Sequence, residues 1–258
     1  MNIVSVALEL SAANQIKLYC QNYLEGATID VTTEDPSYPR YRLYDRAQGL
    51  LFKGTSHPNP FVIKANLGAS GPYPGIDTVI LGANHNLTGL TLTLKYSDND
   101  DSYTVAKSWT GAAGINRQSF TEANHRYWKL EIANPSANPE IGELFLTKVY
   151  SFERSPDYGY GLGNKENVSR GESSSGYSQK TKWGEERKRR NYRLTKMSDG
   201  QRLDLEAFRE TIDGIKNFYI EDLLGNLFFV ELPEGLPDFI AEPMGRWGID
   251  FNILEVLN

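Results

Sequence analysis

Short runs in which apolar and polar residues alternate dominate the first 150 residues of the chain. Alternation with a period of two places every second side chain on the same face of a strand. Clusters of glycine, proline, asparagine and aspartate separate the runs, as expected of tight turns. Five strand-like runs occur, at residues 61–67, 77–82, 90–96, 125–132 and 141–146, and the run at 77–82 is mostly apolar and is therefore expected to be buried on both faces. The pattern predicts an antiparallel β-sandwich in residues 1–150.

The pattern changes after residue 150. Residues 151–175 are rich in glycine and serine and lack apolar periodicity, so they are predicted to be a linker or an extended loop. Residues 176–258 are predicted to form an antiparallel β domain with one helix, because strand-like runs there flank a single segment of helical periodicity. The chain as a whole is therefore expected to be mainly β.

The predicted helix spans residues 199–213. Ser198 and Gln201 have the spacing of a capping box, in which each side chain would bond to the backbone N–H of the other residue. Leu205, Phe208 and Ile212 then recur at intervals of three and four residues, which gives the helix one apolar face.

Size and composition fit a folded chain of two domains. The 258 residues exceed the usual size of a single core, and 40% of them are hydrophobic. Cys20 is the only cysteine, which excludes an intrachain disulfide and fits folding in a reducing cytosol. No run approaches about 18 apolar residues, so no membrane-spanning helix is predicted.

Patterns that carry catalytic or metal chemistry are weak. The three histidines, His57, His85 and His125, are isolated, and no nucleophile elbow, zinc pattern or phosphate-binding loop occurs. Residues 98–101 could offer oxygen ligands to calcium, but they lack the spacing of a calcium loop and fit a hydrated turn better. No carboxylate pair stands out for glycoside hydrolysis, which leaves that activity a distant alternative. The sequence predicts neither an enzyme nor a cofactor.

The strongest local charge anomaly lies at residues 180–196. Eight basic and two acidic residues give this segment a net charge of +6, so the rest of the chain carries −12. Such a segment could bind nucleic acid, form a solvated strand face, or contact the acidic surface of a neighbouring subunit. We favour a subunit interface or a channel lining, formed by Lys182, Trp183, Arg187, Lys188, Arg189, Arg190 and Arg193.

Four tyrosines lie in loops rich in proline and glycine. Aromatic faces with polar groups around them are typical of sugar-binding surfaces. The alternative is that the tyrosines pack within their own loops. The candidate glycan contacts are Tyr38, Tyr41, Tyr44 and Tyr73.

Two stretches resemble known families. The succession of residues 77–87, 90–98, 126–132 and 141–146 resembles galactose-binding-like (discoidin-type) jelly rolls, in the versions found in phage tail proteins. Residues 176–257 resemble the ring-forming belt domain of siphophage distal tail and related minor tail proteins. The second resemblance rests mainly on the helix end FRETIDG followed by FYIED.

These resemblances imply a structural protein of the phage tail tip with an N-terminal jelly roll. Such a protein would be made in the host cytoplasm and assemble in the virion as a ring, a hexamer, around the tail channel. Its expected partners are other copies of itself, tube and hub proteins, a host surface glycan and DNA in transit. The alternative is a carbohydrate-binding module protein without tail assembly. Neither resemblance implies catalytic residues.

Overall fold

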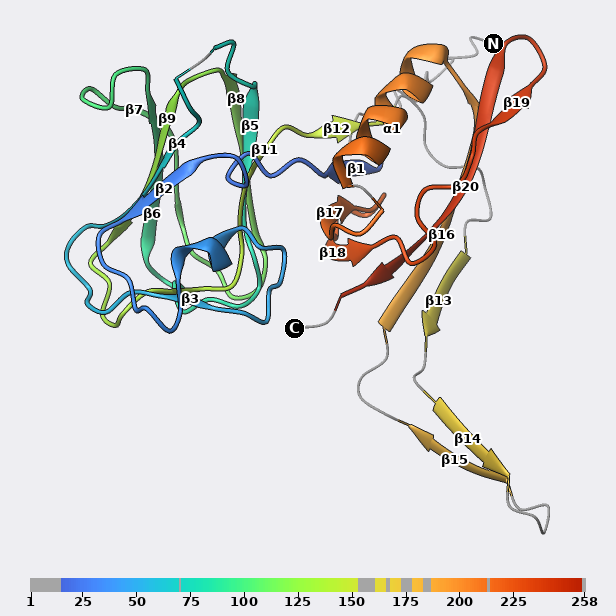
Figure 1. Cartoon of the computed structure of the whole chain (residues 1–258), viewed down its shortest axis with the longest axis horizontal. Helices are drawn as coiled ribbons and strands as arrows, with labels where there is room; N and C mark the ends of the chain where they lie inside the picture. The colour runs from blue at the N-terminus through green and yellow to red at the C-terminus, as the bar shows by residue number, and fades with distance from the viewer. Residues whose placement is uncertain are drawn as a thin grey trace, which may run out of the picture. The chain divides into compact units, whose positions relative to one another are not determined.

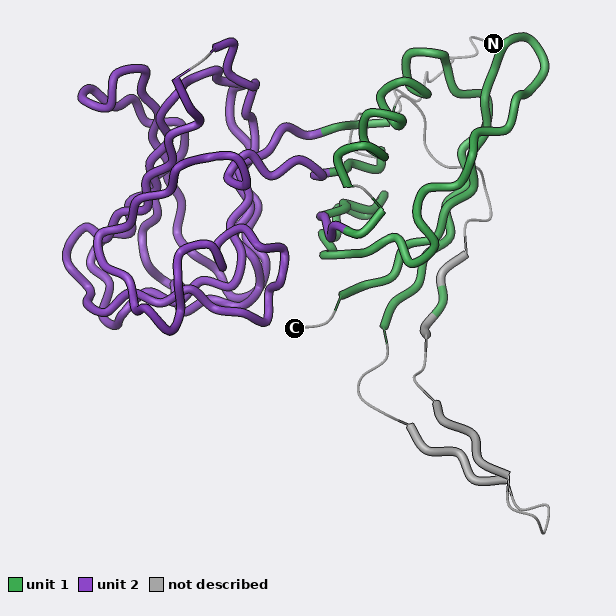
Figure 2. The backbone as a smooth tube through the Cα atoms, viewed as in Figure 1, with its two compact units in different colours: residues 1–18, 150–215, 219–257 green, residues 19–149, 216–218, 258 purple. Residues whose placement is uncertain are grey.

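The computed structural model shows a mainly β protein, as predicted (Figure 1). It describes residues 15–69, 71–152, 161–165, 168–172, 178–182, 187–212 and 214–256. The backbone forms two compact units (Figure 2). Unit 1 comprises Met1–Leu18, Tyr150–Ile215 and Tyr219–Leu257, and unit 2 comprises Tyr19–Val149 with Lys216–Phe218 and Asn258.

Unit 2 is an antiparallel sandwich, which confirms the predicted fold class. One sheet has five strands, in the order β2 (Thr28–Val31), β4 (Phe61–Asn66), β9 (Tyr127–Ala133), β6 (Thr91–Ser97) and β7 (Thr104–Thr110). A second sheet has three, in the order β11 (Leu144–Thr147), β5 (Ile76–Leu81) and β8 (Asn116–Ala123). A further pair consists of β3 (Phe52–Lys53) and β10 (Glu140–Ile141), and a short 3-10 helix, η2, spans Arg40–Leu43.

The core of unit 2 lies between its sheets. Alternate residues of β9 are buried, so Trp128, Leu130 and Ile132 face the core and the residues between them face outward. Leu144 and Leu146 of β11 belong to the same buried cluster. Burial of each such side chain stabilises the fold by roughly 1.5–3 kcal/mol. The alternation therefore fixes which polar residues of the five-stranded sheet reach solvent.

Unit 1 is built on an eight-stranded sheet. Seven strands follow in the order β12 (Tyr150–Ser151), β1 (Lys17–Tyr19), β17 (Phe218–Glu221), β18 (Leu227–Glu231), β20 (Arg246–Glu255), β16 (Arg187–Met197) and β13 (Gly161–Lys165). The eighth, β19 (Ile240–Glu242), pairs with β20, and a separate hairpin joins β14 (Val168–Glu172) to β15 (Ser178–Lys182). Helix α1 (Asp199–Ile212) buries Leu205, Phe208 and Ile212, as its periodicity predicts. Among the described residues, no helix is long and apolar enough to cross a membrane.

Two local expectations differ from the structure. The segment 151–175, expected to be a linker, contains β13 and β14. Only half of the capping box forms: the Ser198 hydroxyl accepts a hydrogen bond from Gln201 N at 3.2 Å. The Gln201 side chain does not reach back, because its position in the helix places it on the same buried face as Leu205.

Candidate functional site

The outer face of the five-stranded sheet carries one row of charged residues. Asp30 on β2 pairs in register with Lys64 on β4, and Lys64 pairs with Lys129 on β9. Lys129 in turn pairs with Lys95 on β6. Neighbouring side chains in such a row have Cβ atoms roughly 4.5–5.5 Å apart and therefore interact directly.

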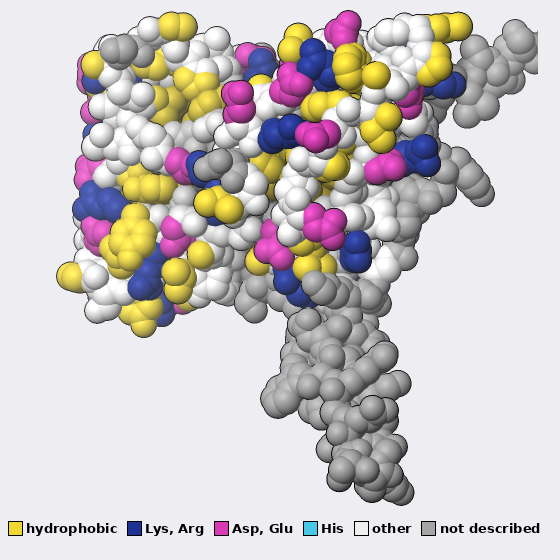
Figure 3. Space-filling model, turned by 45° about the vertical axis from the view of Figure 1, so that its right-hand side comes forward, with side chains coloured by type: hydrophobic (Ala, Val, Ile, Leu, Met, Phe, Trp, Pro, Cys, Tyr) yellow, Lys and Arg dark blue, Asp and Glu magenta, His cyan; other side chains and the backbone are white. Residues whose placement is uncertain are grey.

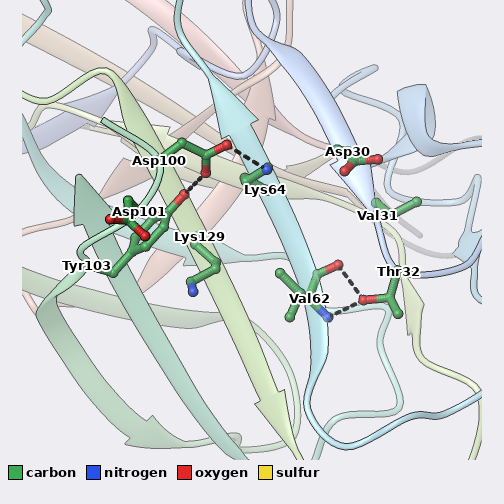
Figure 4. A pocket seen from close by; sticks show the side chains of 9 residues that line it. All are labelled: Asp30, Val31, Thr32, Val62, Lys64, Asp100, Asp101, Tyr103 and Lys129. Atoms are coloured by element: carbon green, nitrogen blue, oxygen red, sulfur yellow. Dashed lines mark hydrogen bonds and ion pairs between the residues drawn. The ribbon is translucent and has the colours of Figure 1, made fainter. Parts of the chain in front are cut away.

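A pocket of about 340 Å³ lies above part of this row (Figure 4). Figure 4 shows Asp100, Asp101 and Tyr103, from the β6–β7 connection, on one side of Lys64. Asp30 lies on the other side of Lys64. Nine residues line the pocket: Asp30, Val31, Thr32, Val62, Lys64, Asp100, Asp101, Tyr103 and Lys129.

The Asp100 carboxylate fixes the β6–β7 connection to the sheet. Lys64 Nζ lies 2.9 Å from Asp100 Oδ2, and the Tyr103 hydroxyl donates a hydrogen bond to Asp100 Oδ1. These two donors hold the pKa of Asp100 below its usual value, and the hydrogen bond to Asp100 raises the pKa of Lys64. Burial and the Asp100 carboxylate raise the pKa of the Tyr103 hydroxyl. Asp100 is therefore ionised and Tyr103 protonated at neutral pH.

A second ion-pair group lies on the neighbouring strands. Lys129 Nζ is 3.0 Å from Glu131 Oε1, and Lys95 Nζ is 2.6 Å from Glu131 Oε2. Burial alone would raise the pKa of Glu131, but the hydrogen bonds from Lys95 and Lys129 outweigh it and lower the pKa. Lys129 Nζ also lies 3.9 Å from the centroid of the Tyr103 ring. Lys129 thus links the pocket wall to the sheet.

The remaining lining residues supply polar and apolar surface. The Thr32 hydroxyl donates to the Val62 carbonyl at 3.2 Å and accepts from Val62 N at 2.8 Å (Figure 4). The nearest described cation to Asp30 is Arg40 Nη1, at 3.7 Å from its carboxylate. The Asp101 side chain is exposed and has no hydrogen bond or ion pair with a described residue. The pocket thus offers ammonium donors, carboxylate acceptors and an aromatic ring to a ligand.

The four tyrosines expected to contact glycans do not line this pocket. Lys53 Nζ and the Arg42 guanidinium lie over the ring of Tyr38, at 4.5 and 5.3 Å from its centroid. Tyr44 packs against the core of unit 2. Tyr73 is half-buried before β5, whereas Tyr41 is 51% exposed.

The acidic turn at residues 98–101 directs its carboxylates to separate partners. Asp98 Oδ1 lies 2.9 Å from His125 Nδ1, whereas Asp100 is paired with Lys64. Asn99 Oδ1 accepts a hydrogen bond from Asp101 N at 3.1 Å, which closes the turn locally. Within the described part of the chain, no three His, Cys, Asp or Glu side chains are grouped so that they could hold a metal ion.

The histidine at position 85 has a structural environment. His85 Nδ1 accepts a hydrogen bond from Leu87 N at 3.1 Å, so the ring proton is on Nε2, which donates to the Gly114 carbonyl at 3.1 Å. Burial lowers the pKa of this imidazole. These contacts fit a turn-stabilising role.

Three of the basic residues expected at a subunit interface form ion pairs within unit 1. Arg187 pairs with Glu231 at 2.7 Å, Arg190 with Asp222 at 2.6 Å, and Arg193 with Asp250 at 3.7 Å. Lys188 and Arg189 are exposed on β16. The side chain of Lys182, and Trp183 altogether, lie outside the described residues. On the described surface visible in Figure 3, basic and acidic side chains are interspersed.

Sequence reasoning missed most of the pocket. Lys64 and Lys129 lie at outward positions of predicted strands, so the alternation indicates that they face away from the core. It does not indicate that they are adjacent, because adjacency depends on the register of strands 65 residues apart in sequence. Asp30, Thr32 and Tyr103 lie on or beside strands that the apolar pattern did not predict.

Among known proteins, the chain is similar only to solved structures. No family model matches the chain, and no curated protein matches it. Chitosan-binding module 1 of a Paenibacillus sp. IK-5 chitosanase/glucanase is 19% identical, with a TM-score of 0.42, and the match covers 50% of this chain and 98% of that module. CpGH89CBM32-6 of Clostridium perfringens is 15% identical, with a TM-score of 0.42 and coverages of 50% and 99%.

A putative α-L-fucosidase of Bacteroides thetaiotaomicron is also similar. Its identity is 14% and its TM-score 0.45, and the match covers 51% of this chain but 29% of the fucosidase chain. All three TM-scores lie below 0.5, so the similarity to these structures does not identify the function of this chain. None of the three structures is a phage tail protein.

Proposed function

We propose that the chain is a non-catalytic carbohydrate-binding protein and that a glycan occupies the pocket on the five-stranded sheet. The observation that carries the proposal is the lining of this 340 Å³ pocket, in which Lys64 and Lys129 stand among three aspartates beside the Tyr103 ring. Small-molecule sites typically have volumes of roughly 300–1,000 Å³ and a few placed polar groups. The volume of this pocket is at the lower end of that range.

The polar groups of the pocket match the chemistry of sugar hydroxyls. A hydroxyl both donates and accepts, so it can bridge a carboxylate such as Asp101 and an ammonium such as Lys129. The side chains of Lys64 and Lys129 are already held by ion pairs of 2.9 and 3.0 Å. Preorganised side chains lose less conformational entropy when a ligand binds.

The pKa of Asp100 does not suit a catalytic acid for glycoside hydrolysis. A glycosidase needs one carboxylic acid that keeps its proton near neutral pH, which requires a raised pKa. The environment of Asp100 does the opposite, because Tyr103 and Lys64 lower its pKa. Asp100 therefore does not fit the role of the general acid.

Binding of the full-length protein to a glycan array, followed by calorimetric titration of the best ligand, tests the proposal. Lys129→Ala removes an ammonium from the pocket and is expected to weaken binding about tenfold, since hydrogen bonds to charged groups contribute roughly 1.5–3 kcal/mol. Tyr41→Ala is the matched control, because Tyr41 is exposed and does not line the pocket. No glycan bound by the array, or equal losses in both variants, would contradict the proposal.

We propose a second candidate function, a structural role in a phage tail, in which copies assemble as a ring with tube and hub proteins. The exposed bases of β16 support it, because Lys188 and Arg189 form no ion pair with a described residue. These bases could meet acidic side chains of another copy. Light scattering at physiological salt should show an oligomer that the double variant Lys188→Glu, Arg189→Glu dissociates, and a monomer at every concentration would contradict this role.

A further inference from the structure

The two ammonium groups of the pocket are already matched by carboxylates. Lys64 pairs with Asp100 at 2.9 Å, and Lys129 pairs with Glu131 at 3.0 Å. Glu131 also pairs with Lys95 at 2.6 Å. The group of Lys129, Glu131 and Lys95 therefore has a net charge of about +1, but Lys95 does not line the pocket. An anionic ligand would therefore meet lysines that already pair with a carboxylate, although each ammonium keeps further N–H donors for a neutral hydroxyl.

Two carboxylates of the pocket have no close ion pair with a described residue, although Asp30 also acts on the neighbouring Lys64. Asp101 is exposed and has no ion pair with any described residue. Asp30 is 3.7 Å from Arg40, and its side chain is 69% exposed. Arg40 is engaged more closely elsewhere, because its Nε donates to Glu34 Oε2 at 2.6 Å. Figure 4 shows Asp101 and Asp30 on opposite sides of Lys64, so both flank the space that a ligand would fill.

We infer that this pocket selects glycans that carry a protonated amine, of the glucosamine type, over neutral and acidic glycans. The inference rests on the proposed function, because it names the class of ligand for the same pocket. The ammonium pairs with Asp101, which has no ion pair with a described residue, and the hydroxyls of the same sugar bond to the remaining polar groups. An exposed ion pair contributes up to about 1 kcal/mol, which corresponds to a preference of about fivefold.

Three hexasaccharides with the same β-1,4-linked backbone test the inference. Their rings differ only at carbon 2, which carries an amine, an N-acetyl group or a hydroxyl. Calorimetric titration of the full-length protein at pH 6 and low salt should give about fivefold tighter binding of the amine form than of the hydroxyl form. The difference should shrink in 0.5 M salt, because exposed charges are screened.

Two variants of the same turn separate the role of Asp101 from a general effect of charge. Asp101→Asn should remove the preference for the amine form, so that the amine and hydroxyl forms bind equally. Asp98→Asn is the matched control, because its carboxylate lies 2.9 Å from His125 and does not line the pocket. Equal effects of the two variants would overturn the inference.

The outcomes also separate this inference from the function on which it rests. Equal or weaker binding of the amine form overturns the inference, and the proposed function stands if a neutral glycan of the array still binds. Failure of the amine form and of every array glycan overturns both.

Discussion

At the scale of single residues, Glu143 is the most strongly perturbed carboxyl of unit 2. Its side chain is fully buried, and its Oε2 has no hydrogen-bond partner among the described residues. Burial raises its pKa well above the usual value, Asp45 adds to the rise, and Arg46 opposes it. Glu143 therefore binds its proton more tightly in the folded protein than in the unfolded chain.

This shift predicts how stability depends on pH. Because the folded-state pKa is raised, the contribution of Glu143 is fully present below the unfolded value of about 4.3 and is lost as pH rises towards the folded value. Glu143→Gln cannot ionise, so it should nearly equal the natural protein at pH 4 and exceed its stability by more than about 1 kcal/mol at pH 8, since one unit of pKa difference corresponds to about 1.4 kcal/mol. Urea unfolding at both pH values is the measurement, and parallel curves would contradict the account.

At the scale of elements, helix α1 forms only one of the two hydrogen bonds that its capping-box motif predicts. The Ser198 cap is present, but the Gln201 amide is 1% exposed and has no hydrogen-bond partner among the described residues. Ser198→Ala should cost about 1 kcal/mol of unfolding free energy, because the N–H of Gln201 loses its acceptor.

Gln201→Leu should cost nothing or should stabilise the protein, because it removes an unpaired buried amide. Thermal unfolding of the two variants compares them directly. A complete capping box would make both substitutions destabilising, and that result would contradict the observed geometry.

The strands show what the apolar pattern can and cannot predict. Residues 61–67, 77–82, 90–96 and 125–132 correspond to β4, β5, β6 and β9, because their inward residues are apolar. The strands β7 and β8 were missed because most of their side chains are exposed or half-buried, so hydrophobic burial does not mark them. The pocket forms from Tyr103, which precedes β7, and from residues that the register of β2, β4 and β9 brings together. Periodicity along the sequence predicts neither the position of Tyr103 nor this register.

At the scale of the whole molecule, the two compact units do not follow one another along the sequence. Unit 1 takes residues from both sides of the jelly-roll-like unit 2, so β1 pairs with β12 across 130 intervening residues. Sequence periodicity indicates the boundary between the units near residue 150. It does not indicate the boundary near residue 18, because the three-residue strand β1 is too short to show a period.

All nine pocket residues and the buried cluster of unit 2 lie within residues 19–149. We therefore expect residues 19–149, expressed alone, to fold and to bind the glycan within about twofold of the full-length protein. Its melting temperature should fall, because the Arg46 guanidinium loses the Asn217 carbonyl at 2.6 Å. Circular dichroism and calorimetry are the measurements, and a folded fragment without affinity would contradict the location of the site.

The most direct test of the central claim is to map the glycan on the protein. Backbone amide shifts of isotope-labelled protein, recorded while the best array glycan is added, report which residues the ligand approaches. We predict shifts concentrated at residues 30–32, 62–64, 100–103 and 129, with Lys64 and Lys129 among them. Shifts concentrated instead at Tyr38, Tyr41, Tyr44 and Tyr73, or no shifts at all, would contradict the claim that this pocket binds carbohydrate.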